Sequence, residues 1–353
     1  MRIALLTDAW KPQLSGASLT LQKTADLLIS RGHLVTVIHP GLFRTVPCPS
    51  YPEIRLAVRP LPKLSAILDE VRPEAIHIPV EGPIGWAGRR YCLTRGRPFT
   101  TAFMTRFPEY IRDRYRLPTA WTEPLFRRFH RPAGRTMVST PSLKQELLAK
   151  GYDDLVIWGR GVDHRLFRPR EKSLLDLPRP IAMSMGRVAV EKNLEDFLRL
   201  DLPGSKVVIG DGPALADLQR AFPEAIFLGR KTGEDLAAHL ASADVFVFPS
   251  RTDTFGIVLV EAMACGLPVA AYPVVGPLDV VRHGRTGWLD WDLSTAIDRA
   301  LTLDRRECRR YALGFSWQES VRQFEANLIP CREDPPAEDP SLAGQANPAG
   351  SRL

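Results

Sequence analysis

The feature that most constrains this chain is an alternation of short apolar runs, each about the length of a strand, with stretches of helical periodicity. A helical stretch at Ser18–Arg31 follows the run Arg2–Thr7, and Gly32 stands where a helix-ending glycine is expected. This alternation is typical of βαβ units built around a parallel sheet. The strands predicted in the first half are Arg2–Thr7, Leu34–His39, Ala75–Ile78, Phe99–Phe103, Thr136–Ser139 and Leu155–Trp158.

The alternation starts again after a stretch at residues 168–180, where three prolines break regular structure. The strands predicted in this second half are Ile181–Met185, Lys206–Ile209, Ala225–Leu228, Val245–Pro249 and Pro268–Ala271. The helical segments between and after them are Leu194–Arg199, Ala214–Ala221, Glu234–Ala241, Val258–Ala264 and Leu293–Leu303. The 353 residues are enough for two domains of roughly 100–200 residues each. We predict an α/β chain with domains at residues 1–168 and 169–314.

The composition limits the partners and the chemistry of the chain. Its formal net charge is +7, and excess positive charge attracts phosphates, nucleic acids and anionic membranes. No nucleic-acid-binding motif is present, so we do not expect a nucleic-acid partner. The five cysteines are scattered without CxxC spacing, which argues against a disulfide scaffold or a zinc site.

The ends of the chain support two further expectations. The short apolar run at the N-terminus does not resemble a secretory signal, and no run reaches the ~18 apolar residues of a membrane span, so we expect a cytoplasmic protein. Residues 331–353 are rich in Pro, Ala, Gly, Ser and acidic residues. Such a segment buries too little apolar surface to offset the entropy of ordering, and we predict a disordered tail.

The first loop with chemical potential follows the first predicted strand, at Thr7–Ser18. It lacks the GxGxxG fingerprint of dinucleotide-binding proteins. Gly16 nevertheless stands just before a predicted helix, where the missing side chain lets backbone N–H groups approach an anion. The alternative is a glycine that only permits the turn.

A second loop, Gly186–Asn193, follows the first strand of the second half. Arg187 and Lys192 in this loop offer a planar guanidinium and a point charge, and together these groups would neutralise a pyrophosphate. The alternative is a solvated cluster of charges.

A third stretch, Asp253–Pro268, follows the predicted strand Val245–Pro249. Asp253 and Glu261 are eight residues apart, about 800° of rotation, so one continuous helix would place both on nearby faces. Backbone amides near Gly256 would receive a phosphate at the helix start. The Glu261 carboxylate would suit a diol such as ribose, and the alternative is an ordinary acid on a helix surface.

Taken in order, these stretches resemble the retaining glycosyltransferases of family 4 in the carbohydrate-enzyme classification. The resemblance extends from residue 1 to about residue 328. It implies the GT-B fold, in which two Rossmann-like domains with parallel sheets face each other across a cleft. It also implies that residues 315–330 form a helix returning to the N-terminal domain. The matching stretches are Thr7–Gly16, Gly159–Pro169, Gly186–Asn193, Gly210–Pro213, Ala243–Ser250, Asp253–Pro268, Gly284–Leu289 and Phe315–Trp317.

The resemblance implies a role for each matching position. Arg187 and Lys192 would hold the diphosphate of a nucleotide-sugar donor and stabilise it as the leaving group, so neither a metal nor a cofactor is expected. Asp253 would contact the hydroxyls of the donor sugar. We take Arg187, Lys192 and Asp253 as catalytic. The donor-binding residues would be Gly16, Gly186, Gly212, Arg230, Thr254, Phe255, Gly256, Ile257, Val258 and Glu261. The expected reaction is a front-face displacement that retains the anomeric configuration.

Two positions depart from the family pattern. Asp253 replaces the usual glutamate and is one methylene shorter. Met104 stands where relatives often have a histidine that faces the donor sugar. We therefore assign no catalytic histidine, and a catalytically silent nucleotide-sugar-binding protein remains one alternative.

The acceptor is expected to bind the N-terminal domain. Residues 89–135 are rich in arginine, with aromatic residues such as Trp121 among them, a composition that suits anionic lipid headgroups. The run His77–Gly85 also resembles bacterial enzymes that glycosylate diacylglycerol. We expect a peripheral enzyme on the inner face of the membrane that moves a hexose or hexuronic acid, favouring a UDP-sugar, to a lipid. The alternatives are transfer from GDP-mannose or another donor to a soluble or polysaccharide acceptor, or an arginine-rich face without function.

Overall fold

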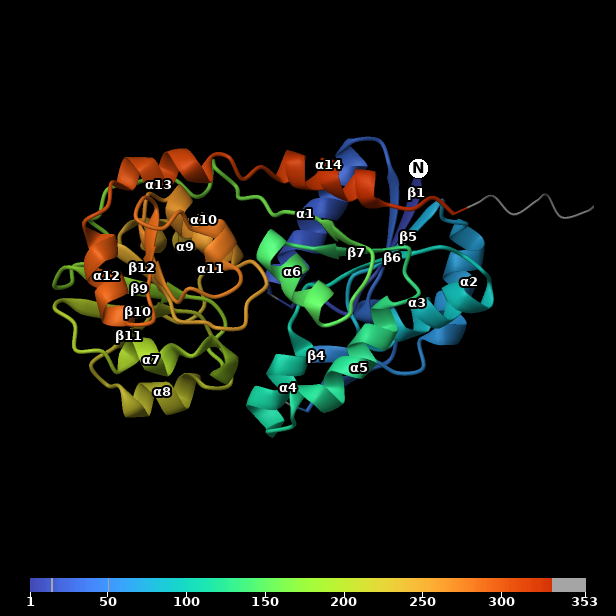
Figure 1. Ribbon diagram of the computed structural model, residues 1–353, viewed down its shortest axis with the longest axis horizontal. Coiled ribbons are helices and arrows are strands. Elements are labelled where there is room, and N and C mark those ends of the chain that lie inside the picture. The colour runs from blue at the N-terminus through green and yellow to red at the C-terminus, as the bar shows by residue number, and fades with distance from the viewer. Residues whose placement is uncertain (14, 50, 332–353) are drawn as a thin grey trace, which may run out of the picture.

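The structure is a computed structural model that describes all residues except 14, 50 and 332–353. The chain forms two α/β units that lie side by side, each built around a parallel sheet of six strands (Figure 1). This architecture confirms the predicted α/β fold with two parallel sheets. The predicted tail, apart from residue 331, lies outside the described residues.

The sheet of the first unit has the strand order β2-β1-β5-β6-β7-β8. Its strands are β1 (Arg2–Leu6), β2 (Leu34–Ile38), β5 (Ala75–Ile78), β6 (Thr100–Ala102), β7 (Arg135–Val138) and β8 (Leu155–Ile157). The chain runs from β1 to one side and then returns to the other side, so Ile3 on β1 is paired with both Val35 and Ala75. Ligands of open α/β sheets bind outside the carboxyl ends of the strands at such a switch point.

The sheet of the second unit has the order β11-β10-β9-β12-β13-β14, with its switch point between β9 and β12. Its strands are β9 (Ile181–Met185), β10 (Ser205–Ile209), β11 (Ile226–Phe227), β12 (Val245–Phe248), β13 (Val269–Ala271) and β14 (Gly287–Leu289). Val245 and Val247 of β12 pack into one apolar core, while Phe246 and Phe248 pack into the core on the opposite face. Burial of both faces explains why the strand reads as a continuous apolar run.

Helices cover the sheet of the first unit, and a small antiparallel hairpin of β3 (Thr45–Cys48) and β4 (Tyr51–Ala57) extends from it. The helices are α1 (Gly16–Ser30), η1 (Pro40–Leu42), α2 (Leu61–Val71), α3 (Pro83–Thr94), α4 (Phe107–Tyr115), α5 (Thr119–His130) and α6 (Pro141–Ala149). Helices α4 and α5 pack together and lie below the rest of this unit in Figure 1.

Helices of the second unit cover both faces of its sheet. They are η2 (Val190–Lys192), α7 (Leu194–Leu198), α8 (Leu215–Ala221), α9 (Gly233–Ala241), α10 (Ile257–Ala264), α11 (Pro277–Val280), α12 (Leu293–Leu301) and α13 (Arg305–Ala312). Among the residues that the structure describes, no helix is long and apolar enough to cross a bilayer.

The last helix, α14 (Trp317–Asn327), leaves the second unit and packs on α1 of the first (Figure 1). Glu325 on α14 accepts hydrogen bonds of 2.8 Å from Arg31 and His33 at the end of α1. Trp158, just after β8, donates to the hydroxyl of Ser320 at 3.1 Å. The division of the chain into domains at residues 168, 314 and 330 stays a prediction.

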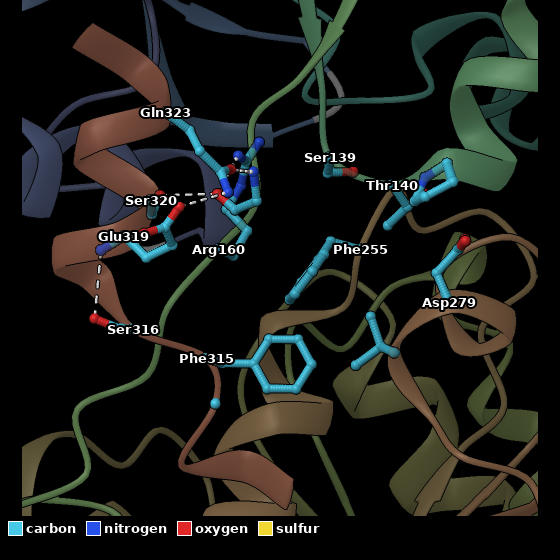
Figure 2. A pocket seen from close by; sticks show the side chains of 14 residues that line it. Ser139, Thr140, Arg160, Phe255, Asp279, Phe315, Ser316, Glu319, Ser320 and Gln323 are labelled. Atoms are coloured by element: carbon cyan, nitrogen blue, oxygen red, sulfur yellow. Dashed lines mark hydrogen bonds between the residues drawn. The ribbon is translucent and has the colours of Figure 1, made fainter. Parts of the chain in front are cut away.

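The chain crosses between the two units twice, and the crossings border a cavity of about 230 Å³ (Figure 2). One crossing contributes Gly159 and Arg160, and the other contributes Gly314, Phe315 and Ser316. Ser320 donates to the Gly159 carbonyl at 2.8 Å, and Gln323 accepts from the Gly159 amide at 2.9 Å. These bonds tie the first crossing to α14.

The predicted strands occur within one or two residues of their predicted ends. The elements that were missed are the β3–β4 hairpin, the edge strand β14 (Gly287–Leu289), most helices of the first unit, and η2, α11 and α13 of the second unit. Most residues of the hairpin and of the edge strand β14 are not buried, so their sequences lack a continuous apolar run.

Candidate active site

Two helix N-termini meet where the two units face each other. Helix α1 begins at Gly16, and a Cβ placed on this glycine would lie 3.7 Å from Cδ1 of Ile257, the first residue of α10. Ser15 caps α1 by accepting a hydrogen bond from the backbone of Ser18. Gly256 caps α10 with a φ of 80°, a conformation that favours glycine. Two helix N-termini so close together provide partial positive charge for an anion.

Lys192 and Asp253 form an ion pair beside these helix starts. The Lys192 ammonium, on η2, lies 2.6 and 2.8 Å from the two carboxylate oxygens of Asp253. Burial alone would lower the pKa of Lys192, but the Asp253 carboxylate together with Tyr110 and Glu191 outweighs burial and raises this pKa above its ordinary value. Lys192 is therefore a fixed positive charge, and the structure brings two of the three predicted catalytic residues into direct contact.

Asp253 and Glu261 do not share one continuous helix, and the helix predicted at Val258–Ala264 is confirmed within one residue. Helix α10 begins at Ile257, so Asp253 lies in the preceding loop. The left-handed backbone of Gly256 separates the loop from the helix. The position of Asp253 is therefore not set by the turns of α10, and its carboxylate contacts Lys192 from the loop.

Arg187 follows β9 and lies on the same side of the second unit as Lys192. Its guanidinium carbon lies 4.7 Å from the ring centre of Tyr51, and one of its nitrogens lies 3.8 Å from the Glu53 carboxylate. Both contacts come from the β3–β4 hairpin of the first unit. Arg187 thus lies between the two units.

Thr254 joins the two units through two hydrogen bonds. Its carbonyl accepts from the Ser139 hydroxyl at 2.7 Å, and its own hydroxyl donates to the Met104 carbonyl at 3.1 Å. Met104, the residue in place of the family's histidine, therefore borders the loop that carries Asp253. The neighbouring Phe255 turns its ring toward Phe315 and the cavity of Figure 2.

Glu261 is buried in the second turn of α10, which excludes the alternative of an ordinary acid on a helix surface. Burial raises the pKa of its carboxyl from 4.5 to about 7. Among the described residues, no neighbouring charge contributes to this shift. A buried carboxyl without a charged partner is suited to a ligand that supplies hydrogen-bond donors.

Two of the predicted donor-binding glycines, Gly186 and Gly212, lie in the loops that follow β9 and β10. A Cβ on Gly212 would lie 2.3 Å from the Val188 carbonyl oxygen, so this close approach requires glycine. Gly186 follows β9 with a φ of 148°. Arg230 is exposed and lies 3.9 Å from the Asp211 carboxylate. These residues follow the carboxyl ends of the strands. The last two predicted donor-binding residues, Ile257 and Val258, are the first two residues of α10.

Sequence reasoning missed three residues that meet at the same place. Tyr51 and Arg114 belong to the first unit, and both contact Glu191 of η2. Tyr51 and Glu191 are 140 residues apart in sequence, and no local pattern relates them. The only signal was the position of Glu191 inside the Arg187–Lys192 loop.

Comparisons with known proteins decide the family. A model described as "Glycosyltransferase Family 4" matches residues 14–166, and one described as "Glycosyl transferases group 1" matches residues 179–302. A GDP-mannose-dependent alpha-mannosyltransferase of Mycobacterium tuberculosis is 30% identical over 92% of this chain and 97% of its own length. The chain belongs to glycosyltransferase family 4. The resemblance seen in the sequence motifs is confirmed, and the protein is a glycosyltransferase.

Further relatives and solved structures agree with this family. The sulfoquinovosyl transferase SQD2 of Arabidopsis thaliana is 30% identical over 80% of this family 4 chain and 60% of its own length. A sucrose-phosphate synthase of Thermosynechococcus elongatus superposes with a TM-score of 0.77 at 20% identity, covering 92% of this chain and 97% of that chain. The Anabaena protein HepE in complex with UDP and glucose gives 0.69 at 16% identity, covering 92% and 98%. These structures confirm the GT-B fold of the family 4 enzyme.

Proposed function

We propose that this family 4 enzyme transfers a hexose or hexuronic acid from a nucleoside-diphosphate sugar to a membrane lipid, with retention of anomeric configuration. One observation carries the proposal. Two cationic side chains, Arg187 and Lys192, follow β9 at the junction of the two units, and Lys192 pairs with Asp253 in the loop that leads into α10, whose start faces that of α1. A diphosphate is the anion whose charge and size suit two cations and two helix starts.

The same groups account for catalysis of the transfer. As the bond between sugar and diphosphate breaks, negative charge grows on the leaving phosphate. Arg187 would hold this phosphate by its planar donors, and Lys192 would act as a point charge whose raised pKa keeps it protonated. Two fixed cations in a partly buried site give the stabilisation that a metal gives in other enzymes, so the proposed reaction is metal-independent.

The remaining predicted residues would each contact a different part of the donor. Asp253, now paired with Lys192, would accept hydrogen bonds from hydroxyls of the sugar once the diphosphate engages the lysine. The backbone from Thr254 to Val258 would contact the phosphate and the sugar. Glu261 would accept both hydroxyl hydrogen bonds of the ribose, and Arg230 with Gly212 would border the base.

Two donors deserve direct comparison. The sequence motifs favour a UDP-sugar, whereas three relatives that are 28–32% identical are named as GDP-mannose-dependent mannosyltransferases. These relatives make transfer of mannose from GDP-mannose the second candidate function. The exposed Arg230 lies at the end of the site where the base would bind, and either base is compatible with that position.

The lipid acceptor is supported by a surface on the first unit. Trp121 is 74% exposed on α5, and Leu125 lies one turn further on the same face, with Leu117 exposed just before the helix. Exposed arginines lie on α4 and α5 or just after these helices. They are Arg112, Arg116, Arg127, Arg128 and Arg131. An exposed tryptophan among arginines suits the interface of an anionic membrane.

The donor assignment is tested by binding and transfer with the purified chain. UDP, GDP, UDP-glucose and GDP-mannose are titrated calorimetrically, and each sugar donor is then assayed for transfer to a diacylglycerol-containing lipid extract. We expect one nucleotide to bind and its sugar to appear in lipid, with transfer reduced about 10²-fold in Arg187→Ala. Binding without transfer or donor hydrolysis would instead identify a catalytically silent nucleotide-sugar-binding protein. Full activity of Arg187→Ala would refute the assigned site.

The membrane assignment has a separate test. We expect the chain to co-sediment with vesicles that contain anionic phosphatidylglycerol at low salt, and to do so less as salt screens the arginines. Vesicles of phosphatidylcholine alone serve as the control. Equal recovery in the supernatant with both vesicle types would exclude an anionic lipid surface as the docking partner and would favour a soluble or polysaccharide acceptor.

A further inference from the structure

The ring of Tyr51 is contacted by two arginines, one from each unit. The ring belongs to the first residue of β4 and is 2% exposed, although it lies on a hairpin at the edge of its unit. Arg114 of α4 covers the ring at 3.9 Å, and Arg187 of the second unit approaches it at 4.7 Å. The site therefore includes an aromatic side chain that none of the sequence motifs indicated.

The hydroxyl of Tyr51 fixes the ring in this place. It donates to the two carboxylate oxygens of Glu191 at 3.0 and 3.1 Å. Arg114 also binds Glu191, at 2.5 Å. Burial and the neighbouring Glu191 carboxylate raise the pKa of Tyr51, so its hydroxyl stays protonated and keeps donating. Glu191 immediately precedes Lys192, so this network also holds the segment that carries the second cation.

A ring holds a cation in a different way from a carboxylate. The face of an aromatic ring attracts the guanidinium without neutralising its charge or using its N–H donors. The Arg187 donors therefore remain available to phosphate oxygens. Glu53, at 3.8 Å, is the competing partner on the same hairpin, and an Arg187 released from the ring would be freer to pair with it.

We propose that Tyr51 is a positioning residue, supplied by the acceptor-binding unit, that aligns Arg187 for the donor diphosphate. This inference rests on the proposed function, in which Arg187 binds that diphosphate. Arg187 would then be aligned for the leaving diphosphate only when the first unit lies against the second. A ring from the acceptor side would thereby link the approach of the two units to the stabilisation of the leaving group.

The inference is tested by a double-mutant cycle read out in nucleotide binding rather than in transfer. The nucleoside diphosphate that binds the wild-type chain, UDP or GDP, is titrated into Tyr51→Met, Arg187→Ala and the double variant. We expect Tyr51→Met to weaken binding by about tenfold, within the range of a desolvated cation–π contact. In the Arg187→Ala background, the same substitution should change the affinity by less than about twofold.

Two further variants separate positioning from folding. Tyr51→Phe keeps the ring and loses the hydroxyl, so we expect it to retain most of the affinity that Tyr51→Met loses. Tyr311 on α13 is a matched control, because the guanidinium carbon of Arg282 lies 4.4 Å from the centre of its ring. Tyr311→Leu removes this ring and should leave nucleotide binding unchanged. Thermal unfolding of each variant identifies any that does not fold, and Tyr51→Leu, which also removes the ring, replaces Tyr51→Met in the cycle if Tyr51→Met does not fold.

The possible outcomes separate this inference from the proposed function. Equal losses from the Tyr51 substitution with and without Arg187 would overturn the positioning role while leaving the donor site intact. A loss in Tyr51→Phe as large as in Tyr51→Met would likewise assign the effect to the hydroxyl network rather than to the ring. If neither UDP nor GDP binds the wild-type chain, the proposed function falls and this inference falls with it.

Discussion

Replacing Glu261 by glutamine should stabilise the empty enzyme while damaging its nucleotide site. The carboxyl is buried, and burial raises its pKa from 4.5 to about 7. A folded-state pKa above the unfolded value means that the folded chain holds the proton more tightly. The stabilising contribution is then complete below about pH 4.5 and is lost as the pH rises through about 7. A rise of this size corresponds to roughly 3 kcal/mol of unfolding free energy.

The assay is urea denaturation of the wild type and Glu261→Gln across the pH range, without nucleotide. Glutamine has nearly the same shape and does not titrate. We expect the variant to be more stable by up to roughly 3 kcal/mol at about pH 9, and the difference to shrink toward its low-pH value at about pH 4.5. A difference that stays constant across this range would show that the Glu261 carboxyl titrates normally and would refute the argument from burial.

Nucleotide binding should change in the opposite direction. The ionised carboxyl accepts two hydroxyl hydrogen bonds from a ribose, whereas the amide of Glu261→Gln accepts with one atom only. We expect the variant to bind its nucleoside diphosphate about tenfold more weakly, since hydrogen bonds to charged groups are worth about 1.5–3 kcal/mol. Affinity of the wild type should also fall as the pH drops below about 7. Unchanged affinity in Glu261→Gln would remove the ribose role.

Three other substitutions probe separate parts of the molecule. Lys192→Ala should lower sugar transfer about 10²-fold in a lipid-transfer assay, because a leaving-group cation is lost. His130→Phe should lower the unfolding free energy by about 2 kcal/mol in urea, since it leaves the buried Glu81 carboxyl without its 2.9 Å hydrogen-bond partner. Trp121→Glu should abolish co-sedimentation with anionic vesicles, whereas the exposed Trp291→Glu on the second unit should bind as the wild type does.

The sequence was sufficient to predict the central strands, because a strand that is buried on both faces needs apolar residues at nearly every position. Ile181–Met185 and Ala75–Ile78 have the same bounds in the structure as in the prediction. The loops after these strands were found for a related reason, since charged residues and glycines follow the apolar runs directly. Gly186 and Arg187 are examples, immediately after β9.

Other features depend on contacts that no local pattern contains. The helix predicted at Val258–Ala264 was placed within one residue of α10, but the ion pair that Asp253 makes from the preceding loop with Lys192 has no signal in the local sequence. The β3–β4 hairpin carries no strong apolar alternation. Its Tyr51 is covered by Arg114 of the first unit and hydrogen-bonded to Glu191, which lies 140 residues further along the chain.

These contacts change how the donor site should be understood. Both predicted cations are already engaged in the structure, Lys192 by Asp253 and Arg187 by Tyr51 and Glu53. Donor binding is therefore an exchange of partners, and its free energy is the difference between two sets of contacts. A bare diphosphate that takes Lys192 leaves the Asp253 carboxylate without its cation, whereas a nucleotide sugar also brings hydroxyls to that carboxylate. If the proposed donor site is correct, the ion pair would favour donors that still carry their sugar over the spent nucleotide and so promote product release.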